Sequence, residues 1–359
     1  MTAAAQATLR RFTPQLVALA AILALNALVF PGFFDLTVQN GRLYGSLVDV
    51  LNRGAPVALL AIGMTLVIAT KGIDLSVGAV MAIAGAVAAA VVTGGGGLAT
   101  ALLLAAAAGI ACGLWNGFLV AVLGMQPIVA TLILMVAGRG IAQLITEGAI
   151  LTFNHPGLIF VGSGAFAGLP MPVLIWLALG ASVTLAVRRS ALGLLIEAIG
   201  INRRAGALCG INSRVLLLAV YAVSGFCAAV AGIIIAADIK GADANNAGLW
   251  LELDAILAVV IGGTSLLGGR FSIVGALLGA MIIQAVNTGI LLSGFPPEFN
   301  LIIKAAIIVI ILVLQSPAVQ TLYGYLRSPP ALPPEVPGKL PAEAAAPDGL
   351  GQETVRRQQ

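Results

Sequence analysis

Long apolar segments dominate this sequence and limit the folds open to it. Ten stretches follow one another, each near the ~20 residues that a helix needs to cross a bilayer. They are residues 14–31, 50–70, 75–93, 98–123, 127–146, 171–188, 215–237, 252–270, 271–292 and 299–316. Unpaired backbone groups are costly in hydrocarbon, so each stretch is expected to be a helix. The predicted fold class is all-α: a polytopic membrane protein with about ten transmembrane helices.

The amino-acid composition is typical of an integral membrane protein. Hydrophobic residues make up 60% of it, charged residues only 9%, and the mean hydropathy is +1.08. A soluble domain carries about 25% charged residues, so there are too few here to cover a water-exposed surface. The formal charge is +4, but the basic residues are spread among loops instead of forming one stripe, which argues against nucleic acid as a partner.

Lysine and arginine set the predicted orientation, because short loops rich in them stay in the cytoplasm. With the N-terminus inside, 13 of the 18 fall in cytoplasmic segments. Three are external (Arg42, Arg53 and Lys240) and two lie within helices (Arg139 and Lys304). Both termini are therefore predicted to be cytoplasmic.

Three regions follow from these segments. Residues 1–13 are a cytoplasmic N-terminus, 14–316 form the transmembrane domain, and 317–359 form a cytoplasmic tail. The stretch from Arg10 to Phe30 resembles a signal peptide, but its apolar part is long and further spans follow, so an uncleaved first helix is predicted. The tail from Ser328 is rich in Pro, Ala and charge and is expected to be disordered.

Metal and disulfide chemistry find little support. The cysteines, Cys112, Cys209 and Cys227, lack C-x-x-C spacing, and His155 is the only histidine. No metal site is predicted, and the cysteines are interpreted as small packing residues.

The longest cytoplasmic loop, residues 188–214, carries charge at both ends with alanine and glycine between. Small residues let a short helix approach another protein closely, while charged ones fix its register. A plain solvated loop is the alternative. The residues predicted to dock are Glu197, Ala198, Gly200, Asn202, Arg203, Arg204, Ala205 and Gly210.

Four sequence strings, in order, carry a family resemblance. KGIDLSVGA begins at Lys71, NGFLVAVLGMQPIVATLILMVAGRG at Asn116, EAIGINRRAGALCGI at Glu197 and LELDAILAVVIGGTSLLGGR at Leu251. Together they resemble the ribose-type ATP-binding-cassette (ABC) sugar permeases over residues 40–316. In that family the loop around Glu197 is the coupling loop to an ATPase. The resemblance therefore implies a permease subunit that moves a monosaccharide by alternating access.

Three further strings resemble the galactofuranose importers of that family: QNGRLYGSLVDVLNR from Gln39, GADANNAGLWLELDAI from Gly241 and NTGILLSGFPPE from Asn287. They imply a furanose or related pentose-shaped cargo. Two positions depart from the family pattern. At position 71 a lysine stands where the family usually has a small residue, and Lys71 could form an ion pair with Asp74. At position 206 a glycine stands where alanine is usual.

The resemblance also implies partners. ABC ATPase subunits, a second permease copy or related permease, and a periplasmic sugar-binding protein are expected around a chain in the bacterial inner membrane. No G-x-x-x-x-G-K-[ST] loop occurs, and GGTSLLGG from Gly262 lacks the lysine. The chain is therefore predicted not to be an enzyme and to hold no cofactor, with ATP and Mg on the partner ATPase.

A sugar path through lipid needs amides and carboxylates inside the bundle, because a polar group facing lipid is costly. Candidates are Asp74, Asn116, Arg139, Glu252, Asp254, Gln284 and Asn287. For the amides, hydrogen bonds that hold helices together are an alternative role. For Arg139, a packing ion pair or a snorkelling position is the alternative.

The external loop 238–249 is polar enough to meet the binding protein. Its candidates are Asp238, Asp243, Asn245 and Asn246, and an ordinary cap over the bundle is the alternative.

Two other functions remain open at this stage. One is a secondary transporter or facilitator that works without an ATPase, for which Asp74 and the glycines around Gly262 leave room. The other is a membrane scaffold without transport. Copurification of an ATPase supports the importer, and sugar flux by the chain alone supports the facilitator.

Overall fold

A computed structural model describes residues 3–39, 41–294 and seven positions between 301 and 313. The described residues belong to one compact unit, Met1–Gln315. Most of the predicted span 299–316 and the whole predicted tail 317–359 lie outside the described residues.

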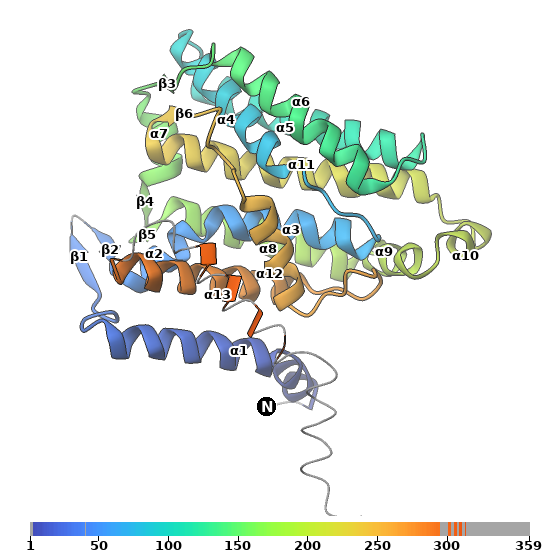
Figure 1. Cartoon of the computed structure of the whole chain (residues 1–359), viewed down its shortest axis with the longest axis horizontal. Coiled ribbons are helices and arrows are strands. Elements are labelled where there is room, and N and C mark those ends of the chain that lie inside the picture. Colours follow the sequence, from blue (N-terminus) through green and yellow to red (C-terminus); the bar gives the residue numbers. More distant parts are fainter. Residues whose placement is uncertain are drawn as a thin grey trace, which may run out of the picture. The chain divides into compact units, whose positions relative to one another are not determined.

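Helices account for most of the structure, as Figure 1 shows. They are α1 (Ala3–Val29), α2 (Ser46–Arg53), α3 (Ala55–Ala69), α4 (Val77–Thr93), α5 (Leu98–Ala121), α6 (Pro127–Ile145), α7 (Pro156–Ser163), α8 (Met171–Arg189), α9 (Leu192–Ile201), α10 (Arg203–Leu208), α11 (Ser213–Ile239), α12 (Leu251–Ile261) and α13 (Ile273–Leu292). Three antiparallel pairs of very short strands join loops: β1 (Thr37–Gln39) with β2 (Arg42–Tyr44), β3 (Leu151–Thr152) with β6 (Gly241–Ala242), and β4 (Ala165–Phe166) with β5 (Leu169–Pro170).

The helical membrane class predicted from the sequence is confirmed. Within the described residues, six helices are long and apolar enough to cross a bilayer: α1 from Phe12, α5, α6, α8, α11 and α13. The bent pair α2 and α3 makes up to seven. Large apolar side chains point outward on these helices, with Leu103 70%, Val136 74% and Leu144 80% exposed. Such outward apolar side chains suit lipid as the surrounding solvent.

Two predicted spans begin elsewhere than expected. The first helix starts at Ala3, although its apolar part, Phe12–Val29, agrees with the predicted span 14–31. The second, predicted as one helix over 50–70, is two helices that meet at a 41° bend. The break falls at Gly54, where a Cβ would lie 2.7 Å from the Val50 carbonyl oxygen of α2, so the backbone there leaves little room for a side chain.

The predicted eighth span, 252–270, is wrong as a continuous helix. α12 ends at Ile261 after 11 residues. Gly263, Gly268 and Gly269 then adopt φ of +86°, +78° and +93°, a left-handed backbone that ends a helix. An 11-residue helix is about 16 Å long, about half of the ~30 Å hydrocarbon core. α12 alone is therefore too short to cross the bilayer.

The centre of the bundle is α3, all 15 residues of which are buried. It packs against α11, which also packs against α4 and α5. Glycines allow the closest approach: a Cβ at Gly225 of α11 would collide with the carbonyl of Gly109 in α5. Small residues at such contacts are the usual means by which membrane helices associate.

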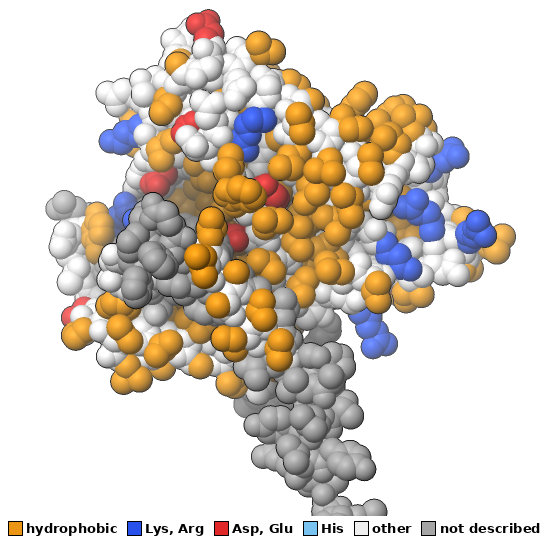
Figure 2. Space-filling model, viewed as in Figure 1, with side chains coloured by type: hydrophobic (Ala, Val, Ile, Leu, Met, Phe, Trp, Pro, Cys, Tyr) orange, Lys and Arg blue, Asp and Glu red, His pale blue; other side chains and the backbone are white. Residues whose placement is uncertain are grey.

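The bundle has two distinct ends. One carries α9 and α10, and the other carries β3, β6 and α7 (Figure 1). We call them the α9–α10 end and the β3–β6 end. In Figure 2 several Lys and Arg side chains gather at the α9–α10 end, and hydrophobic side chains cover most of the visible surface between the ends.

Candidate functional site

The first turn of α12 lies between two cavities. It carries Glu252 and Asp254, each only 6% exposed. Residues two apart on a helix are separated by about 200° around its axis, so the two carboxylates point to different sides. Asp254 lines one cavity and Glu252 the other.

The Asp254 cavity has a volume of about 290 Å³. Three predicted path residues, Asp254, Gln284 and Asn287, line it together with Asp238, which was predicted instead to meet a binding protein. Gln284 comes from the same helix as Asn287, and its Nε2 lies 3.5 Å from the Thr288 hydroxyl. The structure thus brings together polar side chains from positions more than 40 residues apart.

Asn52 and Arg53 also line this cavity, although sequence reasoning did not single them out. Their signal is a polar pair directly before Gly54, where the helix breaks. Within the described chain, the Oδ1 atoms of Asn52 and Asn287 are buried and accept no hydrogen bond. Buried amide oxygens without donors are matched by hydroxyl groups, so the cavity suits a small polyhydroxyl molecule.

The Glu252 cavity is larger, about 460 Å³, and lies between α4, α6 and α12. The predicted path residues Arg139 and Glu252 line it, with Gln143 and Trp250 beside them. Gln143 donates to Asn245 Oδ1 at 2.7 Å.

Arg139 holds an irregular backbone segment. Its Nη1 donates to the carbonyls of Ala244, at 3.0 Å, and Ala247, at 2.6 Å. Both carbonyls belong to the segment between β6 and α12, which has no continuous helix to satisfy them. Non-helical backbone inside a membrane bundle requires such a donor, so the arginine in the middle of α6 has a clear structural task.

Asp74 and Asn116 lie elsewhere, in a closed cluster between α4, α5 and α11. Asp74 Oδ1 accepts from the Ser76 hydroxyl at 2.6 Å, and Oδ2 accepts from the Ser224 hydroxyl at 2.9 Å. Asn116 Nδ2 donates to the Ser76 hydroxyl at 2.8 Å. All four residues are at most 1% exposed. These two path candidates thus line neither cavity beside α12.

The predicted coupling loop forms two short helices, α9 and α10. Asn202 caps α10: its Oδ1 accepts from the backbone N–H groups of Arg204, at 3.0 Å, and Ala205, at 3.1 Å. Arg203, Arg204, Ala205 and Gly210 are exposed, while Glu197 and Ala198 are half-buried. The exposed face of α10 is therefore free to contact another protein.

Gly200 joins this loop to the bundle. It is buried, and a Cβ there would collide with the Ala69 carbonyl at the end of α3 and lie 2.8 Å from the Gly269 nitrogen. Gly269 itself donates to the Ala69 carbonyl at 2.9 Å. The end of α9, the end of α3 and the loop after α12 thus meet at one junction.

Lys71 belongs to the same junction. Its Nζ donates to the Ile201 carbonyl at 2.9 Å, whereas Asp74 accepts hydrogen bonds from Ser76, Asn116 and Ser224. The ion pair considered between Lys71 and Asp74 is therefore replaced by a bond that ties the α3–α4 turn to α9.

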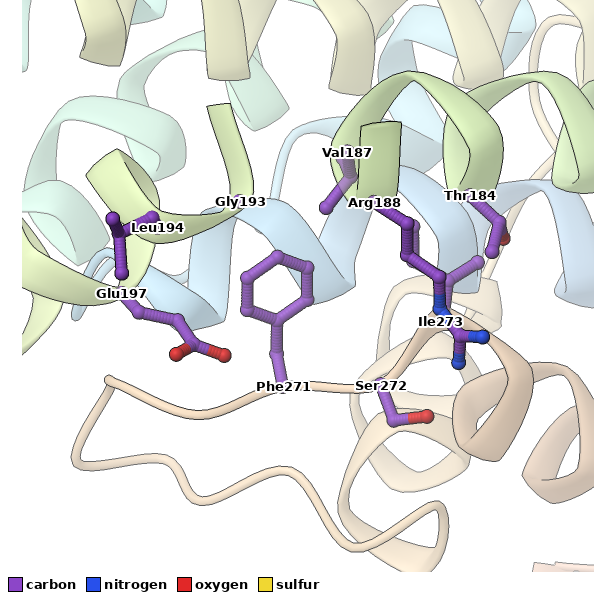
Figure 3. A pocket seen from close by; sticks show the side chains of 9 residues that line it. All are labelled: Thr184, Val187, Arg188, Gly193, Leu194, Glu197, Phe271, Ser272 and Ile273. Carbon is purple, nitrogen blue, oxygen red and sulfur yellow. The ribbon is translucent and has the colours of Figure 1, made fainter. Parts of the chain in front are cut away.

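A third cavity, of about 290 Å³, opens beside α9. Figure 3 shows the Phe271 ring between the carboxylate of Glu197 on one side and the side chain of Arg188 on the other. The walls come from α8, α9 and the start of α13 (Figure 3). This cavity places a charged residue of the predicted coupling loop next to the helix that follows the α12 break.

The turn after β6 holds the other candidates for a binding-protein contact. Asp243 Oδ1 accepts from the backbone N–H groups of Asn245, at 3.0 Å, and Asn246, at 3.1 Å, and Oδ2 accepts from Asn246 Nδ2 at 2.8 Å. The side-chain bond from Asn246 is the main reason that the pKa of Asp243 is lowered. Asn245 and Asn246 are exposed at the β3–β6 end.

In the described part of the chain, no group of three or more His, Cys, Asp or Glu side chains lies close enough together to hold a metal ion. The Nδ1 atom of His155 accepts from the Leu158 N–H at 3.3 Å and so caps α7.

A bundle of apolar helices with polar cavities beside a broken helix defines a polytopic membrane permease. The chain belongs to the family described as the permease component of branched-chain amino acid transport systems, whose model matches residues 46–312. It is 60% identical over 315 residues to the galactofuranose transporter permease protein YtfT of Escherichia coli (strain K12), covering 88% of this chain and 92% of that protein.

Two other curated relatives are sugar import permeases by name. The fructose import permease protein FruF of Bifidobacterium longum (strain NCC 2705) is 42% identical, covering 82% of this chain and 84% of the relative. The ribose import permease protein RbsC of Escherichia coli (strain K12) is 37% identical, covering 82% and 90%. No solved structure matches the chain. These relatives are transporter subunits and not enzymes.

Proposed function

We propose that this chain is the membrane subunit of an ABC importer that carries galactofuranose or a related furanose or pentose-shaped sugar. The names of its relatives support a sugar as cargo. One structural observation carries the assignment: the Asp254 cavity, which is lined by two carboxylates and by Asn52 and Asn287, whose amide oxygens accept no hydrogen bond within the described chain. Sugar hydroxyls are the donors and acceptors that such groups match.

The proposed topology is ten spans with both termini in the cytoplasm of a bacterial cell, the chain lying in the inner membrane. Thirteen of 18 basic residues then face the cytoplasm. The bond between Lys71 and Ile201 supports this arrangement, because it joins two segments that are assigned independently to the same side.

ATP hydrolysis is assigned to partner ATPase subunits that hold ATP and Mg and dock on α9 and α10. The junction of Gly200, Ala69 and Gly269 supports such coupling, since a push on α9 reaches both α3 and the loop after α12. A second permease completes the pore. A periplasmic binding protein delivers sugar at the β3–β6 end, near Asp238, Asp243, Asn245 and Asn246.

The test is reconstitution of the complete importer in proteoliposomes with labelled sugar. Scrambling Glu197–Gly210 should abolish ATP-driven uptake while membrane insertion survives. Gly97→Ala, in the turn between α4 and α5, is the control and should leave uptake intact, because an added Cβ there meets nothing within 4 Å. ATP-coupled uptake by the scrambled variant, or a tag in residues 190–213 detected outside, would contradict the proposal. Sugar flux by this chain alone would favour the facilitator.

A further inference from the structure

The Glu252 cavity carries an aromatic residue whose placement packing does not explain. Trp250 lines it and is 57% exposed, although it is a large ring within an apolar bundle. Its φ is +66°, a left-handed conformation that is uncommon for a bulky residue. A buried ring would contribute far more to folding, so something other than the core is expected to hold Trp250 in this position.

The backbone around Trp250 is fixed from two sides. Gly248, at φ +74°, lies so close to α4 that a Cβ there would come within 2.5 Å of the Gly78 carbonyl. Arg139 of α6 holds the Ala247 carbonyl at 2.6 Å. Contacts with α4 and α6 thus fix the backbone on the N-terminal side of Trp250, and the Trp250 side chain lines the cavity.

Polar groups accompany the ring. Glu252 is only 6% exposed, and its Oε2, which accepts no hydrogen bond within the described chain, packs against Gly78 of α4. Arg139 also lines the cavity, and its hydrogen bonds to Ala244 and Ala247 both use Nη1. At about 460 Å³ the cavity falls within the range of roughly 300–1,000 Å³ that is usual for small-molecule sites.

This combination distinguishes between two small-molecule occupants. A lipid acyl chain offers no partner for a carboxylate and a guanidinium, so these groups would be left unmatched against it. A sugar ring offers both kinds of surface: C–H groups on its faces and hydroxyls around its edge. An aromatic face beside charged hydrogen-bonding groups matches that pattern.

We propose that the Glu252 cavity is a second sugar-contact site, in which Trp250 packs on the face of the ring and Arg139 donates to its hydroxyls. The inference rests on the proposed sugar transport and deepens it. The Glu252 cavity and the Asp254 cavity lie on opposite sides of the first turn of α12.

The test is uptake by the complete importer in proteoliposomes, with D-galactose, which includes the furanose ring form in solution, as the labelled probe. Trp250→Ala should lower uptake by about tenfold, the factor that loss of one aromatic contact produces, while ATP hydrolysis stimulated by the binding protein persists. Trp250→Phe, which keeps a ring, should recover most of the loss. Trp115→Ala is the matched control, because Trp115 is 50% exposed on α5 and should leave uptake unchanged.

A direct measurement keeps the inference testable if a variant fails to fold. Emission from the folded wild-type permease, minus that of Trp250→Phe, should change saturably when D-galactose is added. Wild-type uptake in Trp250→Ala, an equal loss in Trp115→Ala, or no sugar-dependent difference signal would overturn the second site. Absence of any sugar uptake by the wild-type importer would instead overturn the proposed function.

Discussion

The α3–α4 turn and the segment before α12 both interrupt the helical bundle, but their polar groups have different surroundings. At the α3–α4 turn, residues 70–76, Asp74 is enclosed by Ser76 and Ser224 and is 1% exposed. In the segment before α12, residues 243–250, one arginine holds two carbonyls, and the carboxylates that follow line open cavities. Both segments contain acidic residues among apolar helices, yet only the second contributes to the cavities described above.

The difference teaches how a membrane protein can use the same residue types for two purposes. A closed cluster recovers the cost of burying polar groups through internal bonds and so supports the folded state. Polar side chains that line a cavity can in addition contact a bound molecule. Substitutions at the α3–α4 turn should therefore act on folding, and those near α12 on transport.

The largest effect is expected for Asp74→Ala. It removes the acceptor for Ser76, Ser224 and Asn116 and leaves buried donors unpaired, each at about 1–3 kcal/mol. We expect a fall of about 3 kcal/mol or more in the free energy of unfolding, seen as a lower melting temperature in detergent. Asp35→Ala, at an exposed aspartate, is the control. A normal melting temperature for Asp74→Ala would show that the cluster does not stabilise the fold.

Arg139→Met is expected to have the second-largest effect, and it tests the segment before α12 directly. The carbonyls of Ala244 and Ala247 lose their donor, at about 1–3 kcal/mol, and the segment that positions Trp250 and Glu252 loses its fixation. Uptake per folded molecule is expected to fall by about tenfold or more, a loss larger than the stability change explains. Ser182→Ala, which removes a bond within α8, should leave uptake unchanged. Equal uptake by Arg139→Met would remove Arg139 from the mechanism.

Lys71→Met should have a smaller effect, because it removes one exposed bond, to the Ile201 carbonyl. A loss of about 0.5–1.5 kcal/mol is expected, with ATP hydrolysis preserved and uptake per ATP reduced. The ratio of the two rates is the measurement, and Lys240→Met at the other end of the bundle is the control. An unchanged ratio would show that the bond contributes to packing alone.

The smallest effect concerns pH at the Asp243 turn. Bonds from Asn246 lower the pKa of Asp243 in the folded chain, so ionised Asp243 stabilises the turn. This contribution is complete above the unfolded pKa of about 3.9 and is lost as the pH falls through the lower, native value. Amide exchange at Asn245 and Asn246 should be slower in the wild type than in Asp243→Ala at pH 6, with the difference shrinking below about pH 4. A pH-independent difference would contradict this account.

Sequence reasoning located several helices closely, since apolar length is a local property. The predicted 98–123 and 127–146 correspond to α5 and α6. The predicted 252–270 failed, although its glycines were visible, because a glycine permits a break without requiring one. Nor could sequence distinguish Asp74 from Asp254: Ser224, which closes the cluster, lies 150 positions away.

The short α12 has a consequence for any change of cargo. Its first turn is a shared wall one helix thick, about 10 Å across, with Asp254 on one side and Glu252 on the other. A substitution in the first turn that shifts α12 narrows one of the two cavities and widens the other. The Asp254 and Glu252 cavities therefore cannot be reshaped independently. A change in sugar selectivity would require paired substitutions on both faces of α12.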